Sequence, residues 1–510
     1  MLRTDLIRTV PDLLRHHAEL RPAATAFLDE HRSITYGELD ASTARLAGHL
    51  QRLGLARGDR ALILVDNRVE VAEAYLAIPR AGGIAVCVNP ASAPAEIAHV
   101  LDDSGARIVL TDAAHRATVQ ALAADGRRIL VIDEARYAEL LTAESEPPRN
   151  CLELDDPAWM LYTSGTTGRP KGVYLTQRGC LWVVAACFAP ILGLGPDDVV
   201  LSPLPLFHSY ALVLCVLAVV AVGATERILP RFSVQEVLAH LRAGTATVFP
   251  GVPTMFQYLL DRLDGEPLDA PGLRVCMSAG AIMPAALNTA FEYAAGVPLL
   301  DGYGITETST MVTMNWSTGE RVPGSCGLPL PGLTVRLVDP GTGVDALPGA
   351  EGELWVQGPN VTPGYHNLPD ATAAVLVDGW YRTGDLGRRD EHGFLRISGR
   401  TKELIIRGGE NIYPAEVEAA IMATGVVKDA AVVAAPHRSL GEVPVAFVVA
   451  PDGVDHSALL AACADRLAPY KMPAQVIEID AIPRTGSGKI LRFRLQEQLS
   501  GRKADSGADR

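Results

Sequence analysis

The stretch LYTSGTTGRPKGVYLT, residues 161–176, joins two short apolar segments through a loop of hydroxyl residues and glycines. Glycine lets successive backbone N–H groups point into one concavity, which favours phosphate oxygens. Lys171 adds a positive charge at the end of the loop. A P-loop would need a helix directly after Gly-Lys, whereas VYLT is typical of a strand. The stretch therefore predicts a phosphate-binding loop between two strands. Its hydroxyl donors are Thr163, Ser164, Thr166 and Thr167, and its glycines are Gly165 and Gly168.

The bulk composition indicates an ordinary globular protein of 510 residues, with 48% apolar and 20% charged residues. The net charge of −14 argues against nucleic acid as a main partner, because phosphate backbones require a basic surface. The eight cysteines show no Cys-x-x-Cys spacing, so we expect no zinc site and a reducing, cytoplasmic location. The N-terminal stretch MLRTDLIRTVPDLL has no long apolar core and carries acids, so we expect no signal peptide. The longest apolar run, Ala211–Val222, is shorter than the ~20 residues of a membrane span and predicts a buried helix.

The apolar pattern predicts an α/β fold. Strands expected at residues 61–65, 107–112, 128–133 and 158–162 alternate with helices, which favours largely parallel sheets. The expected helices cover residues 37–54, 69–81, 233–243, 253–263 and 284–295. After about residue 320, short strands between Gly and Pro turns predict a β-rich part, and a compact α+β stretch follows residue 399. We place the domain boundary near Arg400, giving domains 1–400 and 401–510. On pattern alone, a simple transition from strand to loop explains this position better than a hinge does.

A second group of candidate residues lies in DGYGITET, residues 301–308. Gly302 and Gly304 keep the backbone accessible, and Tyr303 offers a ring for stacking on a base. Thr306 offers a hydroxyl, and Glu307 offers a hard oxygen ligand suited to Mg²⁺. A tight turn with a solvated glutamate is the alternative interpretation.

Two further motifs follow. In YRTGDLGRR, residues 381–389, Asp385 is placed to accept hydrogen bonds from both hydroxyls of a ribose, with help from Arg400. A hairpin turn with aspartate at a favoured position is an equal alternative. In PRTGSGKILR, residues 483–492, Lys489 ends a Gly/Ser loop. A lysine on such a loop gains a function only if the loop closes over a site.

In order and spacing, the four motifs resemble those of the adenylate-forming superfamily, which includes acyl- and aryl-CoA synthetases, adenylation domains of peptide synthetases and firefly luciferases. The resemblance runs from ITYGELD at residues 34–40 to GKILR, and GGENIYPAEVE (408–418) and FHSYAL (207–212) are most similar to the acyl- and aryl-CoA synthetase branch. It implies a large multilayer N-terminal domain of two α/β sheets with a β-barrel-like subdomain. It also implies a small, mobile α+β C-terminal domain that carries a catalytic lysine loop.

The resemblance also implies roles for single residues, and these are expectations. The loop Thr163–Gly168 and Lys171 would hold the β- and γ-phosphates of ATP, and Lys489 would bridge the carboxylate and the α-phosphate. The other nucleotide and metal contacts would be Gly302 and Tyr303 on adenine, Asp385 and Arg400 on the ribose, Thr306 on the α-phosphate, and Glu307 with Thr166 on Mg²⁺. Lys402 would be the hinge, and Gly408 and Gly409 would border the tunnel for the pantetheine arm of coenzyme A. His208 would border the acyl and thiol channels, with a packed core histidine as a serious rival.

The implied function is ATP-dependent activation of a carboxylic acid to an acyl adenylate, followed by transfer to the thiol of coenzyme A. A stand-alone ligase that loads a carrier-protein phosphopantetheine is the alternative, and an oxygenating luciferase-like enzyme or a non-catalytic ATP-binding scaffold is less favoured. Amino-acid-activating relatives place an aspartate where this chain has His208, so we expect an acyl or aryl acid without an amine. The expected pocket is mostly small or apolar and draws on Phe207, His208, Val252, Ser278, Ala279, Gly280, Gly302, Met311 and Met314.

Overall fold

The computed structural model describes residues 2–122, 126–144, 152–163, 169–408, 410–451, 453–464, 466–484 and 490–506. The chain forms two compact units. The larger unit comprises Met1–Thr334 with Val356–Tyr381, and the smaller unit comprises Val335–Trp355 with Arg382–Arg510. The domain boundary expected near residue 400 stays a prediction.

One sheet of the larger unit has six strands in the order β6-β5-β3-β4-β7-β8. All neighbours run parallel except β7 and β8, which form an antiparallel hairpin. Its strands are β3 (Arg60–Leu64), β4 (Ile84–Cys87), β5 (Ile108–Thr111), β6 (Arg128–Val131), β7 (Pro157–Thr163) and β8 (Lys171–Thr176). Helices connect the strands, as the alternating pattern predicts: α3 (Val69–Arg80), α4 (Pro94–Ser104), α5 (Arg116–Leu122) and α6 (Ala135–Thr142).

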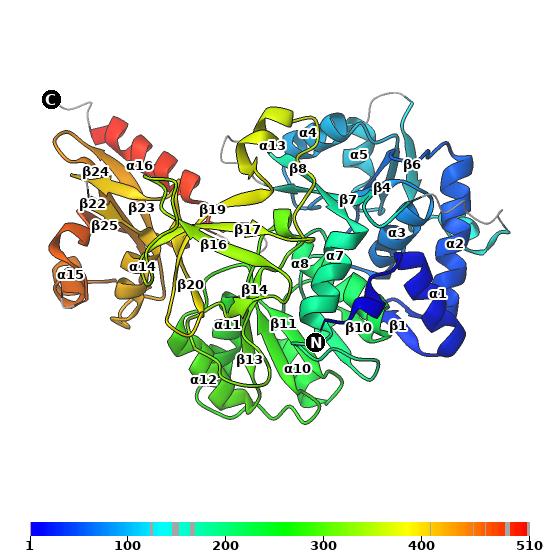
Figure 1. Cartoon of the computed structure of the whole chain (residues 1–510), viewed down its shortest axis with the longest axis horizontal. Coiled ribbons are helices and arrows are strands. Elements are labelled where there is room, and N and C mark those ends of the chain that lie inside the picture. The colour runs from blue at the N-terminus through cyan, green and yellow to red at the C-terminus, as the bar shows by residue number, and fades with distance from the viewer. Residues whose placement is uncertain are drawn as a thin grey trace. The chain divides into compact units, whose positions relative to one another are not determined.

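The second sheet of the larger unit has nine strands in the order β15-β14-β13-β12-β11-β9-β10-β1-β2. Its centre is parallel, and the added edge strands β2, β14 and β15 are antiparallel. The strands are β1 (Thr25–Leu28), β2 (Ser33–Thr35), β9 (Val199–Ser202), β10 (Thr225–Ile228), β11 (Val248–Gly251), β12 (Val275–Ser278), β13 (Leu299–Tyr303), β14 (Thr313–Met314) and β15 (Leu328–Pro329). Figure 1 shows helices α10 (Val234–Arg242), α11 (Pro253–Leu263) and α12 (Ala285–Ala295) beside β11 and β13.

Both faces of each sheet are covered, so the larger unit is layered. On β3, Ala61 and Ile63 join the main core between the sheets, whereas Leu62 and Leu64 pack with α4 and α5 on the outer face. Helices of the shared middle layer include α1 (Val10–Leu20), α2 (Tyr36–Arg52), α7 (Gln177–Val183) and the π-helix η2 (Val184–Phe188). Strands buried on both faces explain the continuous apolar runs in the sequence. The predicted pair of α/β sheets is confirmed.

Local sequence signals explain the helix ends. Thr35 and Glu38 form a capping box at the start of α2, and Gly54 adopts a φ of 96° just after it ends. The run Ala211–Val222 is helical and fully buried, as expected, within α8 (Ser209–Ala211), the π-helix η3 (Leu212–Ala218) and α9 (Val219–Val222). Among the described residues, no helix combines the length and the hydrophobicity that a membrane crossing requires.

The β-rich part expected after residue 320 forms a third sheet, in the order β16-β17-β19-β18 with β20 paired to β19. Its strands are β16 (Thr334–Val338), β17 (Gly352–Gln357), β18 (Leu376–Val377), β19 (Trp380–Arg389) and β20 (Leu395–Arg400), and helix α13 (Pro369–Val375) precedes β18. A fourth sheet has the order β22-β21-β24-β23 with β25 paired to β24. It comprises β21 (Ile405–Arg407), β22 (Glu410–Ile412), β23 (Asp429–His437), β24 (Gly441–Val449) and β25 (Gln475–Glu478), with α14 (Pro414–Met422), α15 (His456–Ala464) and α16 (Arg492–Ser506).

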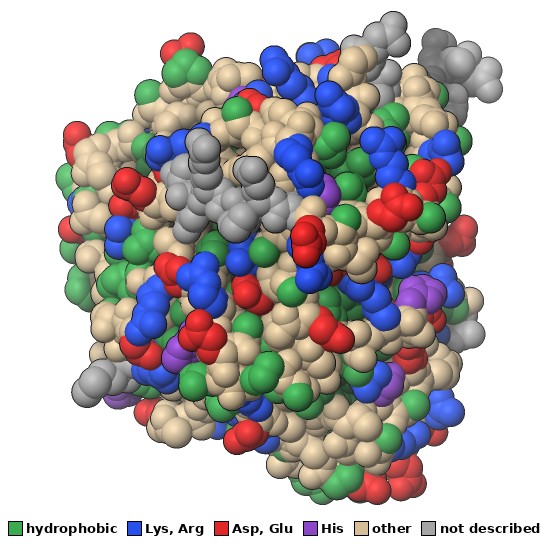
Figure 2. All heavy atoms as spheres, turned by 90° about the vertical axis from the view of Figure 1, so that its right-hand side faces the viewer, with side chains coloured by type: hydrophobic (Ala, Val, Ile, Leu, Met, Phe, Trp, Pro, Cys, Tyr) green, Lys and Arg blue, Asp and Glu red, His purple; other side chains and the backbone are tan. Residues whose placement is uncertain are grey.

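The surface carries both signs of charge. On the face drawn in Figure 2, described Lys and Arg side chains are interspersed with Asp and Glu side chains and with scattered apolar ones. The net charge of −14 is therefore not gathered into one acidic area on this face.

Candidate active site

The hairpin of β7 and β8 carries the predicted phosphate loop. Thr163 ends β7 directly opposite Lys171, the first residue of β8. Lys171 is half-buried, and its ammonium forms no hydrogen bond or ion pair with a described residue. The charge of Lys171 is therefore available to an anion at the mouth of the hairpin. The remaining loop residues, Ser164, Gly165, Thr166, Thr167 and Gly168, lie outside the described residues.

The predicted adenine segment lies where β13 ends, at the carboxyl edge of the nine-stranded sheet. Gly302 and Tyr303 pair with β14, so their backbones are fixed by the sheet. A Cβ at Gly304 would lie 1.7 Å from the carbonyl oxygen of Thr310, a distance that no side chain tolerates. Glycine is therefore required at position 304 for the chain to turn this closely.

A strained turn follows this edge. The 3₁₀ turn η4 (Thr306–Thr308) is followed by two residues other than glycine with positive φ, Ser309 at 49° and Thr310 at 87°. Backbone strain of this kind is found where a site must be held in one shape. The Thr306 hydroxyl lies 3.5 Å from the hydroxyl of Ser209 at the start of α8, which points it toward the middle layer.

Glu307 belongs to a cluster that also contains Lys171 and two tyrosines. The Tyr365 hydroxyl donates to Glu307 Oε1 (3.0 Å) and lies 3.1 Å from the Tyr381 hydroxyl. The Lys171 ammonium sits over the Tyr365 ring, 5.2 Å from its centre. The structure thus brings together Glu307 and Lys171, which the sequence placed in separate motifs. Sequence reasoning missed Tyr365 and Tyr381, although Tyr381 opens the YRTGDL motif.

His208 is held at the N-terminus of α8, where its ring lies 4.4 Å from the Phe207 ring. Its Nε2 is buried and has no hydrogen-bond partner among the described residues. Burial lowers the pKa of His208 to about 4, so the imidazole is neutral at physiological pH. A neutral ring with an unpartnered nitrogen suits a lining residue better than a general base. Both the channel role and the packed core remain compatible with this geometry.

The smaller unit holds the predicted ribose pair. Asp385 on β19 lies opposite Arg400 on β20, and Arg400 Nε lies 2.8 Å from Asp385 Oδ1. Asp385 is buried, and its backbone N–H donates to the Thr383 hydroxyl (3.0 Å). The strand pairing and this ion pair hold the carboxylate in one orientation.

The remaining predicted residues lie in or near the second half of the smaller unit. Lys402 is exposed in the turn after β20, and Gly408 has a φ of 61° with its N–H donating to the Leu440 carbonyl (2.7 Å). Gly409 and Lys489 lie outside the described residues. The roles of these four residues stay predictions.

Comparison with known protein families identifies the family of this chain. Residues 14–366 match the model of the AMP-binding enzymes, and residues 416–489 match that of the AMP-binding enzyme C-terminal domain. The chain belongs to the AMP-binding enzymes.

Individual relatives of this AMP-binding enzyme are ligases and synthases. Feruloyl-CoA synthase of Amycolatopsis sp. is 38% identical, over 94% of this chain and 97% of the relative. The naringenin synthase of Pestalotiopsis fici is 37% identical over 96% of this chain, but the chain spans only 19% of that protein. The o-succinylbenzoate coenzyme A synthetase of Bacillus subtilis, solved with ATP and magnesium ion, superposes with a TM-score of 0.84 at 33% identity, over 95% of this chain and 99% of that one.

These matches confirm the predicted family, its acyl- and aryl-CoA synthetase branch and the class of acid–thiol ligase. They also confirm the mixed α/β fold with a large N-terminal and a smaller C-terminal part. The mobility of the C-terminal part and the roles of single residues stay predictions.

Two polar groups are buried without partners beside the adenine segment of this AMP-binding enzyme. Ser278, the last residue of β12, is paired with Asp301 in the middle of the parallel strand β13. Ser278 Oγ and Asp301 Oδ1 have no hydrogen-bond partner among the described residues. Burial raises the pKa of Asp301 well above its usual value, which favours the neutral acid. Ser278 was expected to line the acyl pocket, whereas no pattern in the sequence indicated that Asp301 would be buried.

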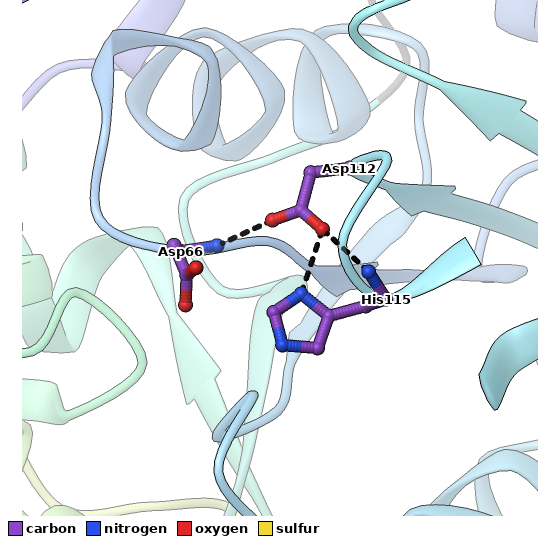
Figure 3. A group of neighbouring side chains, drawn as sticks. All are labelled: Asp66, Asp112 and His115. Carbon is purple, nitrogen blue, oxygen red and sulfur yellow. Dashed lines mark hydrogen bonds and ion pairs between the residues drawn. The ribbon is translucent and has the colours of Figure 1, made fainter. Parts of the chain in front are cut away.

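A separate group of Asp66, Asp112 and His115 lies at the carboxyl ends of β3 and β5, with ligand-type atoms within 4.8 Å of one another. Figure 3 shows that Asp112 accepts hydrogen bonds from the Asp66 N–H (3.0 Å) and from the backbone N–H of His115 (2.9 Å). Its Oδ1 also lies 2.6 Å from His115 Nδ1. These bonds engage both oxygens of Asp112 in ordering the two loops, and we assign the group a structural role.

Proposed function

We propose that the chain activates a carboxylic acid with ATP to an acyl adenylate, releases pyrophosphate, and transfers the acyl group to coenzyme A. The observation that carries this proposal is the cluster of Lys171, Tyr365 and Glu307, in which one tyrosine beside β8 contacts both a cation and a carboxylate. The end-to-end match to feruloyl-CoA synthase supports the choice of thiol acceptor.

The first step brings a carboxylate against an α-phosphate that is already anionic, so oriented donors and cations must offset the charge. Lys171 and the hydroxyl of Thr163 would serve the β- and γ-phosphates, together with the backbone N–H groups of the loop that follows Thr163. Thr306 would serve the α-phosphate, and Lys489 would bridge it to the acid.

The residues present fit a magnesium ion. Glu307 offers a hard anionic oxygen, and its Oε2 has no hydrogen-bond partner among the described residues. Glu307 would hold the ion together with Thr166. A bound Mg²⁺ would neutralise phosphate charge, while Lys171 and the loop keep the polyphosphate in line.

The acid would be an acyl or aryl acid without an amine. The expected pocket is largely apolar, and Val252, Met311 and Met314 are buried. Because burial favours the neutral form of Asp301, this carboxyl offers no negative charge to pair with an ammonium group, and a histidine such as His208 carries no negative charge in either protonation state. The first candidates are aromatic acids such as ferulate or o-succinylbenzoate, because relatives of this chain are named for these acids.

The second step needs a thiol to reach the adenylate. We propose that the segment with Gly408 and Gly409 borders the path of the pantetheine arm after a swing about Lys402. A carrier-protein phosphopantetheine would use the same path and is the alternative acceptor.

The deciding experiment is acid-dependent release of pyrophosphate from ATP across a panel of carboxylates, with and without coenzyme A. The panel would contain hydroxycinnamates, benzoates, o-succinylbenzoate, fatty acids and phenylalanine. We expect release with an aryl or acyl acid, faster turnover with coenzyme A, and no release with phenylalanine. Pyrophosphate release that does not depend on any acid would refute the proposal, and a mass shift on a carrier protein but not on coenzyme A would favour the alternative acceptor.

A further inference from the structure

Tyr365 occupies an unusual position among the charged groups of the site. Its backbone is pinned, since it forms an isolated β-bridge with Val173 of β8 and its N–H donates to the Thr372 hydroxyl (2.9 Å). The side chain is half-buried and reaches two ionisable residues that lie far apart in the sequence, Lys171 and Glu307. A tyrosine fixed at its backbone can hold both in one geometry.

The direction of the hydrogen bonds follows from the proton count. The Tyr365 hydroxyl has one proton, which it donates to Glu307 Oε1 (3.0 Å). The 3.1 Å contact between the hydroxyls of Tyr365 and Tyr381 then requires Tyr381 to be the donor. Burial, and next the carboxylate of Glu307, raise the pKa of both tyrosines above the usual range, so both stay protonated donors. The result is a relay from Tyr381 through Tyr365 to the carboxylate.

The ring of Tyr365 serves a second residue. The Lys171 ammonium lies 5.2 Å from the ring centre, within the range of a cation–π contact. This contact restrains the lysine without neutralising it, since a ring face carries no net charge. A carboxylate partner would instead compete with a bound phosphate.

We propose that Tyr365 is a positioning residue that presets Glu307 for a magnesium ion and Lys171 for the polyphosphate of ATP. The hydroxyl orients the carboxylate, and the ring face orients the ammonium. Groups that orient a metal ligand typically change metal affinity about 10–100-fold when removed. The inference rests on the proposed function only in that the site binds ATP with magnesium.

Two substitutions at Tyr365 separate the roles. Tyr365→Phe keeps the ring over Lys171 and removes the hydroxyl, whereas Tyr365→Leu removes both. Tyr381→Phe removes only the outer member of the relay. The matched control is Tyr174→Phe, in the same strand as Lys171, which removes a hydroxyl bonded to His366 Nδ1 (2.5 Å).

The measurement is ATP binding by calorimetry over a series of Mg²⁺ concentrations and in EDTA, without any acid. Adding Mg²⁺ should raise the affinity for ATP, and the midpoint of this rise defines a Mg²⁺ concentration. In Tyr365→Phe we expect this midpoint concentration to increase about tenfold or more, whereas the ATP affinity measured in EDTA should not change. Tyr365→Leu should add a loss of about 2- to 30-fold in EDTA. Tyr381→Phe should lie between the wild type and Tyr365→Phe, and Tyr174→Phe should match the wild type.

Each outcome decides the inference. An unchanged Mg²⁺ dependence in Tyr365→Phe overturns it, as does an equal change in Tyr174→Phe. If Tyr365→Leu does not fold, Tyr365→Phe and Tyr381→Phe still test the relay. A wild type that binds ATP but releases no pyrophosphate with any acid refutes the proposed function and leaves the inference standing. A wild type that binds no ATP refutes both.

Discussion

A buried acid in the main core should make the larger unit less stable as the pH rises. Glu226 on β10 is 0% exposed, and neither carboxylate oxygen meets hydrogen-bond geometry with a described residue. Burial raises its pKa well above the usual value, and the Cys215 thiol and the Ser202 hydroxyl beside it offset this only in part. The substitution Glu226→Gln removes the titration while keeping the shape of the side chain.

The magnitude follows from proton linkage. Above about pH 4.3 the unfolded chain has lost the Glu226 proton, while the folded chain keeps it up to its raised pKa. The free energy of unfolding therefore falls with rising pH by about 1.4 kcal/mol per pH unit within this window. Between pH 5 and pH 7 the contribution reaches about 2.7 kcal/mol if the folded pKa exceeds 7. In Glu226→Gln the amide changes the free energy of unfolding by the same amount at every pH, and the fall with rising pH that Glu226 causes is absent.

The assay is urea unfolding at pH 5, 6, 7 and 8, followed by tryptophan fluorescence and circular dichroism. We expect Glu226→Gln to gain stability relative to the wild type at each step up in pH. Asp198→Asn is the control, because the pKa of Asp198 is shifted in the opposite direction to that of Glu226. Burial raises the pKa of Asp198, but hydrogen bonds from Arg274, Thr247 and Gly195 outweigh burial and lower it. The ionised Asp198 stabilises the folded chain at every pH above the pKa that Asp198 has in the unfolded chain, and this stabilisation is lost only in acid. The difference in the free energy of unfolding between Asp198→Asn and the wild type should therefore stay constant from pH 5 to 8. A constant difference for Glu226→Gln would refute the reasoning.

Three further predictions concern the site. Lys489→Ala should slow adenylation about 10²–10³-fold or more yet spare thioester formation from supplied acyl adenylate, and equal losses in the two half-reactions would contradict its role. Burial lowers the pKa of His208 to about 4, so its ring should not titrate between pH 5.5 and 8. The pH profiles of kcat/KM for the wild type and for His208→Gln should therefore run parallel over this range. An ionisation near pH 6.5 that appears only in the wild type would count against a neutral ring. Gly304→Ala should weaken ATP binding at least about tenfold, because its Cβ would lie 1.7 Å from the Thr310 oxygen. Gly195→Ala, with nothing within 4 Å of its Cβ, should bind ATP normally in the same calorimetric titration.

The elements that sequence patterns predicted best are those with local signals. The helix at 253–263 begins with Pro253 and matches α11 residue for residue, since proline favours a first turn. The strand expected at 107–112 is β5, an apolar run just after a left-handed Gly105. In both cases neighbours in the sequence carry the information, so no knowledge of the fold was needed.

Features that depend on distant contacts were not predictable. Tyr365 lies 58 positions from Glu307, and nothing in GYHN distinguishes a tyrosine that orients a carboxylate from one that packs. The left-handed Ser309 and Thr310 gave no signal either, because positive φ is predicted from glycine or asparagine rather than from serine or threonine. Such features arise only when the tertiary structure overrides local preference.

The unfavourable features of the larger unit give independent support for the position of the site. Ser309 and Thr310 hold positive φ, and Ser278 Oγ and Asp301 Oδ1 are buried without a described partner. An unpartnered buried polar group costs about 1–3 kcal/mol, and strained residues cost a similar amount. Ser278 ends β12, Asp301 lies within β13, and Ser309 and Thr310 follow the short turn that comes after β13, so all four belong to the carboxyl side of these strands, where ligands of parallel sheets bind. Costs concentrated at one edge indicate selection for a preset ligand surface rather than for stability, and this argument stands apart from any motif.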